Sequence, residues 1–214
     1  MTGAVAVIAG ATGLVGGALV RRLAEDGAWR EVRALVRQRL PPELAGPKVV
    51  PIEVDYARLE PPSPWAAADH VFCALGTTMR QAGSREAFRQ VDLEYPLALA
   101  RAARAQGARH FLLVSSLGAA AGSRFFYNRV KGEVEQAVSA LGFRSVTIAR
   151  PSLLVGRRAE PRPGEQLGKL LGVLAPPSWR PVPATRVAEA LVRAAKRDEP
   201  GIRILENRDL RRDA

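Results

Sequence analysis

The sequence has a single cysteine, Cys73, so an intrachain disulfide cannot form. Proteins that lack disulfides are typical of reducing compartments, and we therefore expect a cytoplasmic protein. Cys73 lies within the apolar run VFCAL, which favours a buried packing role over a reactive one.

Long apolar runs are also absent. No stretch approaches the ~20 apolar residues that a membrane-spanning helix needs. The first apolar run, residues 4–9, is too short for the core of a signal peptide. We therefore expect neither a membrane span nor a signal peptide. Hydrophobic residues make up 47% of the 214 positions and charged residues 25%, as in an ordinary globular protein.

Histidine is scarce, with only His70 and His110 in the chain. Both open predicted strands, which places them at the end of the sheet opposite the ligand crevice. That position keeps them away from Ser116 and argues against a hydrolase triad. No spacing combines them with Cys73 into a metal site, so we predict that no metal is bound.

Acidic residues are outnumbered, since 32 lysines and arginines against 21 acidic residues give a net charge of +11. Such a balance can indicate nucleic-acid binding. Here the arginines are scattered from Arg21 to Arg212, and no basic segment is interleaved with aromatic residues. We therefore expect no nucleic-acid partner, and we attribute part of the charge to attraction of an anionic cofactor.

Strand-like and helix-like segments alternate along most of the chain, which predicts an α/β protein with a doubly wound parallel sheet. We expect one Rossmann-type domain over residues 1–214, in which 151–214 forms a small substrate-side part. The predicted strands are 4–9, 31–37, 49–54, 70–75, 110–115, 145–149 and 202–205. The predicted helices are 14–25, 92–106, 126–141, 166–174 and 185–197.

Three glycines, Gly10, Gly13 and Gly16, follow the first predicted strand and open the first predicted helix. Gly10 allows a sharp turn, Gly13 allows the backbone to approach a pyrophosphate, and Gly16 allows the helix to pack closely on the sheet. The helix N-terminus offers N–H groups and a positive dipole end to phosphates. This context predicts a dinucleotide site.

The end of the second predicted strand indicates which dinucleotide is bound. An acidic residue at that point holds the ribose 2′-hydroxyl of NAD, whereas an arginine suits the 2′-phosphate of NADP. The chain reads RALVRQR there, with Arg37 and Arg39 and no acid. We therefore predict NADP(H), with Arg37 on the 2′-phosphate.

A second pattern indicates chemistry rather than binding alone. The fifth predicted strand ends in Ser115–Ser116, and the following helix carries Tyr127 and Lys131 four positions apart, on one face. An ammonium beside a phenol favours the phenolate, which lets the tyrosine exchange a proton near neutral pH. A serine hydroxyl at the strand end can polarise a carbonyl.

GATGLVG, SS and YNRVK together resemble the short-chain dehydrogenase/reductase superfamily. The segments CALGTTMRQAGS, VDLEYPLALA, HFLLVSSLGA, FFYNRVKGEVE, ARPSLLVGRRAEPRPGE and RILEN are similar to the atypical group around the HIV Tat-interactive protein 2 oxidoreductase. One departure from most members of the superfamily is the segment of only ten residues between Ser116 and Tyr127, which predicts a short loop over the site.

The resemblance implies roles for individual residues. It places Ser116, Tyr127 and Lys131 in the catalytic set, with Lys131 also on the nicotinamide ribose. The cofactor-binding residues that it implies are Gly10, Thr12, Gly13, Leu14 and Val15 at the pyrophosphate, Arg37 at the 2′-phosphate, Asp55 near the adenine, Leu75 and Gly76 under the adenosine ribose, and Pro151 at the nicotinamide.

These features predict an NADP(H)-dependent oxidoreductase that reduces an unidentified small carbonyl compound. Two alternatives remain: an NADPH-binding redox sensor or regulatory protein with little or no turnover, and an epimerase or dehydratase acting on a nucleotide sugar. The part after Pro151 is small and offers little to hold a nucleotide sugar. A homodimer is left open.

Overall fold

The structure is a computed structural model that describes residues 3–59, 63–156 and 179–212. Its centre is a sheet of parallel strands in the order β3-β2-β1-β4-β5-β6-β9. The strands are β1 (Ala4–Ala9), β2 (Trp29–Val36), β3 (Val49–Glu53), β4 (His70–Cys73), β5 (His110–Val114), β6 (Ser145–Arg150) and β9 (Gly201–Glu206). The predicted doubly wound α/β fold is confirmed.

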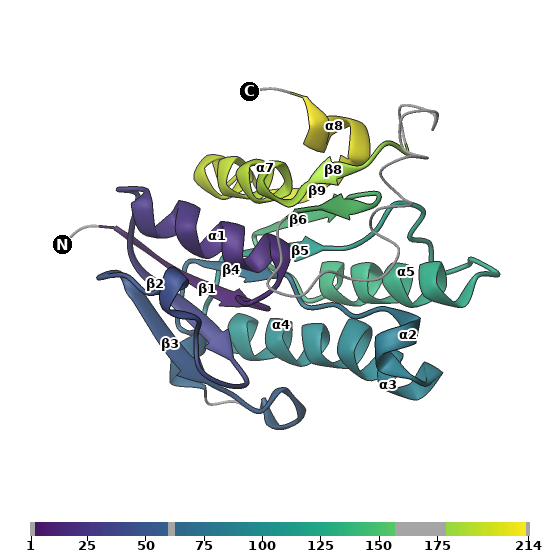
Figure 1. Ribbon diagram of the computed structural model, residues 1–214, viewed down its shortest axis with the longest axis horizontal. Coiled ribbons are helices and arrows are strands. Elements are labelled where there is room, and N and C mark those ends of the chain that lie inside the picture. The colour runs from purple at the N-terminus through teal and green to yellow at the C-terminus, as the bar shows by residue number, and fades with distance from the viewer. Residues whose placement is uncertain (1–2, 60–62, 157–178, 213–214) are drawn as a thin grey trace.

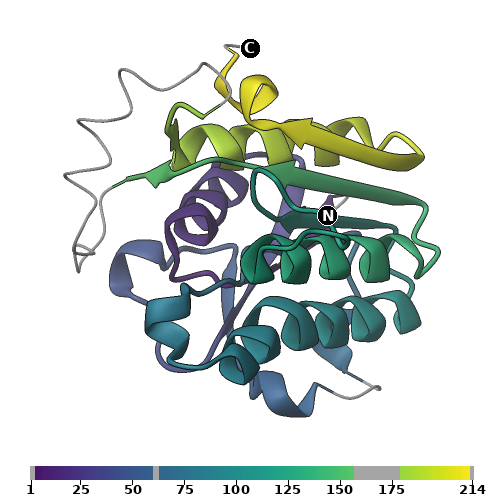
Figure 2. The ribbon, with the colours of Figure 1, turned by 90° about the vertical axis from the view of Figure 1, so that its right-hand side faces the viewer.

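Helices cover both faces of this sheet. Figure 1 shows α1 (Leu14–Glu25) and α7 (Ala184–Arg197) on one face, with α4 (Tyr95–Ala105) and α5 (Phe126–Ser139) on the other. The last two lie side by side in Figure 2. Shorter helices are α2 (Met79–Ala82), α3 (Arg85–Arg89) and α8 (Asn207–Arg211), and a two-stranded sheet pairs β7 (Leu154–Val155) with β8 (Val182–Pro183).

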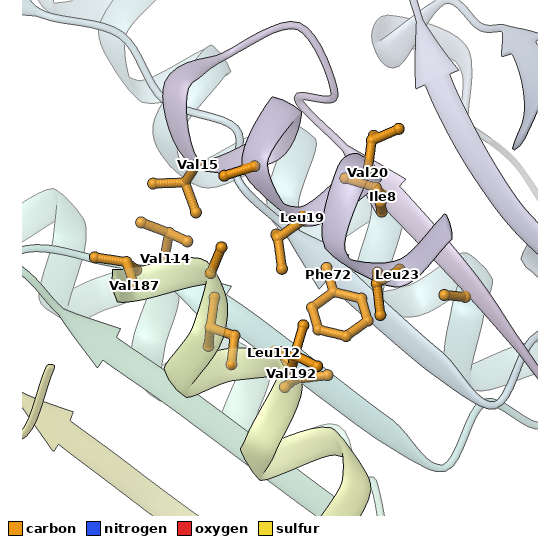
Figure 3. Packing of buried hydrophobic residues seen from close by; sticks show 14 of the residues in the cluster. Ile8, Val15, Leu19, Val20, Leu23, Phe72, Leu112, Val114, Val187 and Val192 are labelled. Atoms are coloured by element: carbon orange, nitrogen blue, oxygen red, sulfur yellow. The ribbon is translucent and has the colours of Figure 1, made fainter. Parts of the chain in front are cut away.

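Strand periodicity divides the core into two layers. In β1, Ala6 and Ile8 point to the layer under α1 and α7, whereas Val5, Val7 and Ala9 point to the layer under α4 and α5. Both faces are therefore buried, which explains the nearly continuous apolar strands. Figure 3 shows the first layer, where side chains of the two helices meet those of the strands: Ile8, Val15, Leu19, Val20, Leu23, Phe72, Leu112, Val114, Val187 and Val192.

The predicted elements agree with the structure except at one helix and at several ends. The helix predicted over 92–106 begins earlier, because α3, a π-helical turn (η4, Gln90–Glu94) and α4 follow one another without a break. The short helices α2 and α8 and the short strands β7 and β8 were not predicted. The helix predicted over 166–174 lies outside the described residues.

The first βα turn is fixed by two glycines. Gly10 has φ +79°, and a Cβ on it would lie 2.5 Å from the Ala74 carbonyl oxygen. A Cβ on Gly16 would lie 1.9 Å from the Gly10 carbonyl oxygen. The backbone of α1 therefore packs directly against the turn, and the turn packs directly against the segment after β4.

Replacing Gly16 with alanine tests this close approach. Gly16→Ala places a methyl group on a backbone oxygen that cannot move aside, and we expect it to lower the free energy of unfolding by about 1–3 kcal/mol or more. Gly17→Ala is the matched control, because its Cβ would meet nothing nearer than 3.5 Å. The control should be neutral or stabilising by up to about 1 kcal/mol. Equal urea-unfolding curves for the two variants would contradict the assignment.

Candidate functional site

The site lies where the strand order reverses, between the carboxyl ends of β1 and β4. In a doubly wound sheet this point opens into the crevice that binds ligands. Three segments meet there: the turn after β1, the loop from Ala74 to Thr78 after β4, and the loop after β5. The contact between Gly10 and Ala74 joins the first two segments. The implied ribose residues Leu75 and Gly76 therefore lie beside the glycine turn.

The head of α1 is free to receive an anion. Its N-cap, Gly13, provides no side-chain hydrogen bond, and no acidic residue occupies the first turn. The first N–H groups of a helix have no acceptor within the helix, and they carry the positive end of its dipole. A Cβ on Gly13 would meet only the Gly10 oxygen, at 3.3 Å, so this position is open on its outer side. These observations fit the pyrophosphate of a dinucleotide.

The other residues of this turn have different environments. Thr12 is exposed and Leu14 is half-buried. Val15 is buried in the core beneath α1, so only its backbone N–H can contribute to a phosphate site. The structure thus brings all the residues expected at the pyrophosphate to one end of α1.

Beside the turn is an open hollow of about 320 Å³, lined by Arg37, Glu53, Val54, Asp55, Tyr56 and Tyr95. The structure thus brings together Arg37, which is expected at the 2′-phosphate, and Asp55, which is expected near the adenine. Tyr56 connects the hollow to the glycine turn, because its hydroxyl donates to the Leu35 carbonyl at 3.2 Å and accepts from the Gly10 N–H at 3.4 Å. Burial raises the pKa of Tyr56, which keeps this hydroxyl protonated.

Lys131 lies at the centre of the crevice, in a buried ion pair that the sequence analysis missed. Its ammonium Nζ is 2.7 Å from Oδ1 of Asp92, and both side chains are almost fully buried. The second carboxylate oxygen of Asp92 accepts the Thr77 N–H at 2.9 Å. Burial by itself lowers the pKa of Lys131, but Asp92, with Tyr127, outweighs that effect and raises it above the ordinary value. Lys131 is therefore a fixed cation.

A proline explains why Asp92 points inward. Pro96 has no N–H for the Asp92 carbonyl four residues earlier, and its ring would collide with that carbonyl in a regular helix. The chain widens into a π-helical turn, in which the Tyr95 N–H donates to the Gln90 carbonyl. Such turns often occur at functional sites. Asp92 does not open a helix, as the predicted range 92–106 implied, because the helix begins at Arg85. The proline four positions later was the available signal.

Tyr127 lies one turn before Lys131 on the same face of α5. Its ring packs against Phe88, with 5.4 Å between ring centroids, and contributes electrostatically to Lys131. Among the described residues, its hydroxyl makes no hydrogen bond. The phenol is thus held by its ring while its oxygen is free to meet a ligand.

The two adjacent serines have different partners. Ser115 is buried and donates to Oε1 of Glu135 at 2.5 Å, and both oxygens of that carboxylate also bind Arg150, at 3.1 and 2.6 Å. Ser116 makes only a long contact of 3.5 Å with the Leu117 carbonyl. The Leu117 N–H donates to the Pro151 carbonyl at 2.8 Å, which brings the loop after β5 beside Pro151. Only Ser116 therefore has a hydroxyl available to a ligand.

Comparison with known proteins identifies the family. The NAD(P)H-binding family matches residues 10–198. Protein HTATIP2 of Rattus norvegicus is 37% identical over 190 residues, covering 86% of this chain and 78% of that protein. The mitochondrial protein FMP52 of Saccharomyces cerevisiae is 34% identical over 175 residues, covering 78% of this chain and 73% of that protein. The chain belongs to the HTATIP2/FMP52 family of atypical short-chain dehydrogenases/reductases. It is a nicotinamide-nucleotide-binding protein of the oxidoreductase type.

Solved structures share the fold. The crystal structure of gox2253 has a TM-score of 0.74 at 23% identity and covers 94% of this chain and 69% of its own. MoeE5 in complex with UDP-glucose and NAD has a TM-score of 0.72 at 18% identity and covers 95% of this chain and 75% of its own. At these identities the likeness supports the Rossmann-type fold alone.

The predicted cytoplasmic location is wrong, because several fungal relatives are named as mitochondrial proteins. A single cysteine excludes an intrachain disulfide, but it cannot distinguish one reducing compartment from another. Within the described residues, no helix combines the length and apolarity needed to cross a membrane.

Removing the charge of Asp92 tests the ion pair. Asp92→Asn leaves the Lys131 ammonium buried without its counter-ion, so we expect the free energy of unfolding to fall by about 3–5 kcal/mol at neutral pH. Glu94→Gln, an exposed change in the same turn, should alter it by less than about 0.5 kcal/mol. Urea unfolding at neutral pH measures both.

The pH dependence distinguishes a lost ion pair from altered packing. In the wild type the folded pKa of Lys131 is raised, so the pair contributes fully below about pH 10.4, the unfolded value, and is lost only at higher pH. In Asp92→Asn the largest effect that opposes burial is removed, so burial lowers that pKa. The deficit of the variant, which is the amount by which its free energy of unfolding falls below that of the wild type, should therefore shrink between about pH 7 and pH 10. A deficit that stays constant over this range would refute the electrostatic account.

Proposed function

We propose that the chain is an NADP(H)-dependent reductase that converts a small carbonyl compound into an alcohol, with Ser116, Tyr127 and Lys131 at the reacting centre. The observation that carries the proposal is the environment of Lys131. Its ammonium is buried and paired with Asp92, one helical turn from the unbonded Tyr127 hydroxyl. A protein that only bound a nucleotide would have no evident use for this arrangement.

Tyr127 would donate the proton. The bound reduced nicotinamide supplies the hydride that the carbonyl carbon accepts. As the carbonyl oxygen gains negative charge, the Tyr127 hydroxyl gives it a proton, and the products are an alcohol and a phenolate. The Lys131 ammonium has three N–H donors, of which Asp92 takes one. The other two can stabilise the phenolate and hold a ribose hydroxyl, until Tyr127 regains a proton from solvent.

Ser116 would orient the carbonyl. A hydroxyl at the carboxyl end of β5 can donate to the carbonyl oxygen and stabilise the charge that develops on it. Ser115 cannot take this role, because its hydroxyl is buried and bound to Glu135. The Leu117–Pro151 contact supports the position of Ser116 beside the crevice.

The choice of NADP over NAD rests on Arg37. This side chain is exposed at the end of β2, lines the hollow, and forms no ion pair within the described part of the chain. A guanidinium without a carboxylate partner suits a phosphate, which it can bind with two parallel hydrogen bonds. Glu53 lines the same hollow and would repel a phosphate there. The proposal therefore requires that the attraction of the 2′-phosphate to Arg37 exceed its repulsion by Glu53.

We also propose that the chain forms one domain, with 151–214 on the substrate side. β9 extends the central sheet beside β6, and α7 packs against α1. A Cβ on Gly156 would lie 3.0 Å from Leu14 at the head of α1, so the start of this part reaches the crevice. The substrate would be a small molecule bound between these surfaces.

Cofactor choice can be measured by fluorescence titration of NADPH and NADH. Arg37→Gln should weaken NADPH binding roughly tenfold or more, which corresponds to about 1.5–3 kcal/mol for a charge-assisted contact. NADH binding should change little. Arg39→Gln is the control, because Arg39 does not line the hollow. Glu53→Gln should strengthen NADPH binding. Equal affinity of the wild type for the two nucleotides would refute the assignment of Arg37.

Tyr127→Phe separates an enzyme from a sensor. Purified protein with NADPH would be screened against aldehydes, ketones and quinones, following the loss of NADPH absorbance. The variant keeps the ring that packs on Phe88, so folding and NADPH affinity should change little. Turnover should fall by about 10²–10⁴-fold, the usual contribution of a positioned proton donor.

The results also distinguish the alternatives. A redox sensor would show no turnover above background with any substrate, while Lys131→Met would still weaken NADPH binding. Turnover of a substrate that Tyr127→Phe leaves unchanged would rule out the proposed proton donor without affecting the fold.

A further inference from the structure

A second cluster of polar side chains lies at the end of the sheet opposite the crevice. His70 and His110 open β4 and β5 and are directly paired across these strands. Asp198 ends α7 above them. One ligand atom from each of the three side chains lies within 4.8 Å of the other two. The sequence analysis could pair the histidines only with Cys73, because Asp198 comes far later in the chain.

Both histidines are buried, and each has one ring nitrogen without a partner. His70 is 7% exposed and His110 1% exposed, and neither Nδ1 atom has a hydrogen-bond partner. A buried nitrogen left without a partner normally costs stability. Two such atoms in residues that cluster with a carboxylate therefore suggest a group that the three side chains share.

The other ring nitrogen of His110 is held in place. Nε2 of His110 is 2.9 Å from the Thr147 hydroxyl oxygen. With its proton on Nε2, directed at that hydroxyl, His110 would present the lone pair of Nδ1 to the cluster. Outer hydrogen bonds of this kind orient the histidines of metal sites.

The geometry of His110 and Asp198 fits a shared cation better than a direct hydrogen bond. Nδ1 of His110 is 3.4 Å from Oδ1 of Asp198, which is long for an N–H···O bond. Two ligand atoms at about 2.0–2.1 Å from a tetrahedral Zn²⁺ ion are separated by about 3.3–3.4 Å. Arg144 binds the other carboxylate oxygen at 2.6 Å, while Oδ1 accepts from the Ser145 hydroxyl at 3.3 Å and also faces His110.

The backbone at Asp198 adds to this argument. Asp198 has φ +44° and is the only non-glycine residue with a positive φ in the described ranges. Glycine would occupy this left-handed position at the end of a helix at lower cost. An aspartate there indicates that its carboxylate is needed.

We propose that His70, His110 and Asp198 bind one Zn²⁺ ion, with water as the fourth ligand. Two neutral imidazoles and a carboxylate are ligands that zinc prefers. The ion would connect the amino ends of β4 and β5 to the end of α7, at the end of the sheet opposite the crevice. Its role would be structural, and the site is independent of the proposed reductase activity.

The test uses untagged protein dialysed against EDTA, because a polyhistidine tag would itself bind zinc. Co²⁺ is the first probe, since it gives strong visible absorption when four-coordinate, and Zn²⁺ is then titrated calorimetrically. We expect one Co²⁺ per chain, displaced by Zn²⁺. Zinc should also raise the unfolding temperature. The chain has no histidine outside the cluster and a single buried cysteine, so competing ligands are few.

Variants locate the ion. Asp198→Asn keeps a residue that tolerates the left-handed conformation, and it should weaken zinc binding at least tenfold. His70→Gln should abolish the Co²⁺ absorption. Glu189→Gln is the matched control, because it removes one negative charge from the same helix and should leave zinc affinity unchanged. Circular dichroism checks folding, and Asp198→Asn decides the question if His70→Gln does not fold. Zinc affinity in Asp198→Asn equal to that of the wild type, or no zinc bound by the wild type, would overturn the proposal.

Discussion

The buried ion pair of Asp92 and Lys131 joins two helices to the loop after β4, one of the segments that shape the crevice. Asp92 belongs to the helix that runs from α3 into α4, Lys131 belongs to α5, and the Thr77 N–H donates from the loop after β4. Removing two charges from water costs several kcal/mol for each ion, and apolar residues of the same volume would often be at least as stable. The retention of the pair is therefore better explained by function. It fixes a cation within reach of Tyr127 and Gly76, which no apolar substitute could do.

The parallel sheet gives the molecule two chemically different edges, one formed by the carboxyl ends of its strands and the other by their amino ends. All carboxyl ends of the strands meet at the crevice, where the glycine turn, Ser116 and Lys131 gather. All amino ends meet at the opposite edge, where the pairing of β4 with β5 sets His70 beside His110. A site at this second edge can hold the strands together without obstructing the first. The two edges share β4 and β5, so rigidity gained at the histidines would also restrain the loops that carry Gly76 and Ser116.

How much could be predicted from the sequence depended on the distance between interacting residues. The glycine turn, the serine pair and Tyr127 with Lys131 are local patterns with a fixed geometry, and their positions were predictable. Asp92 and Asp198 were missed, because each meets partners distant in the chain. For Asp92 the sequence did contain a signal, Pro96, since a proline inside a helix disturbs the turn that contains the fourth residue before it. For Asp198 nothing nearby identifies the histidines that it approaches.

A row of three side chains on one side of α5 explains why Ser115 and Ser116 have different hydrogen-bond partners. Tyr127, Lys131 and Glu135 are spaced four residues apart, so they lie along one side of the helix, facing the sheet and its carboxyl edge. Glu135 is buried and needs a donor and a cation, which Ser115 and Arg150 provide. Ser116 takes no part in this network, and its hydroxyl makes only the long contact with the Leu117 carbonyl. The need to satisfy one buried carboxylate thus occupies Ser115 and leaves Ser116 for a ligand.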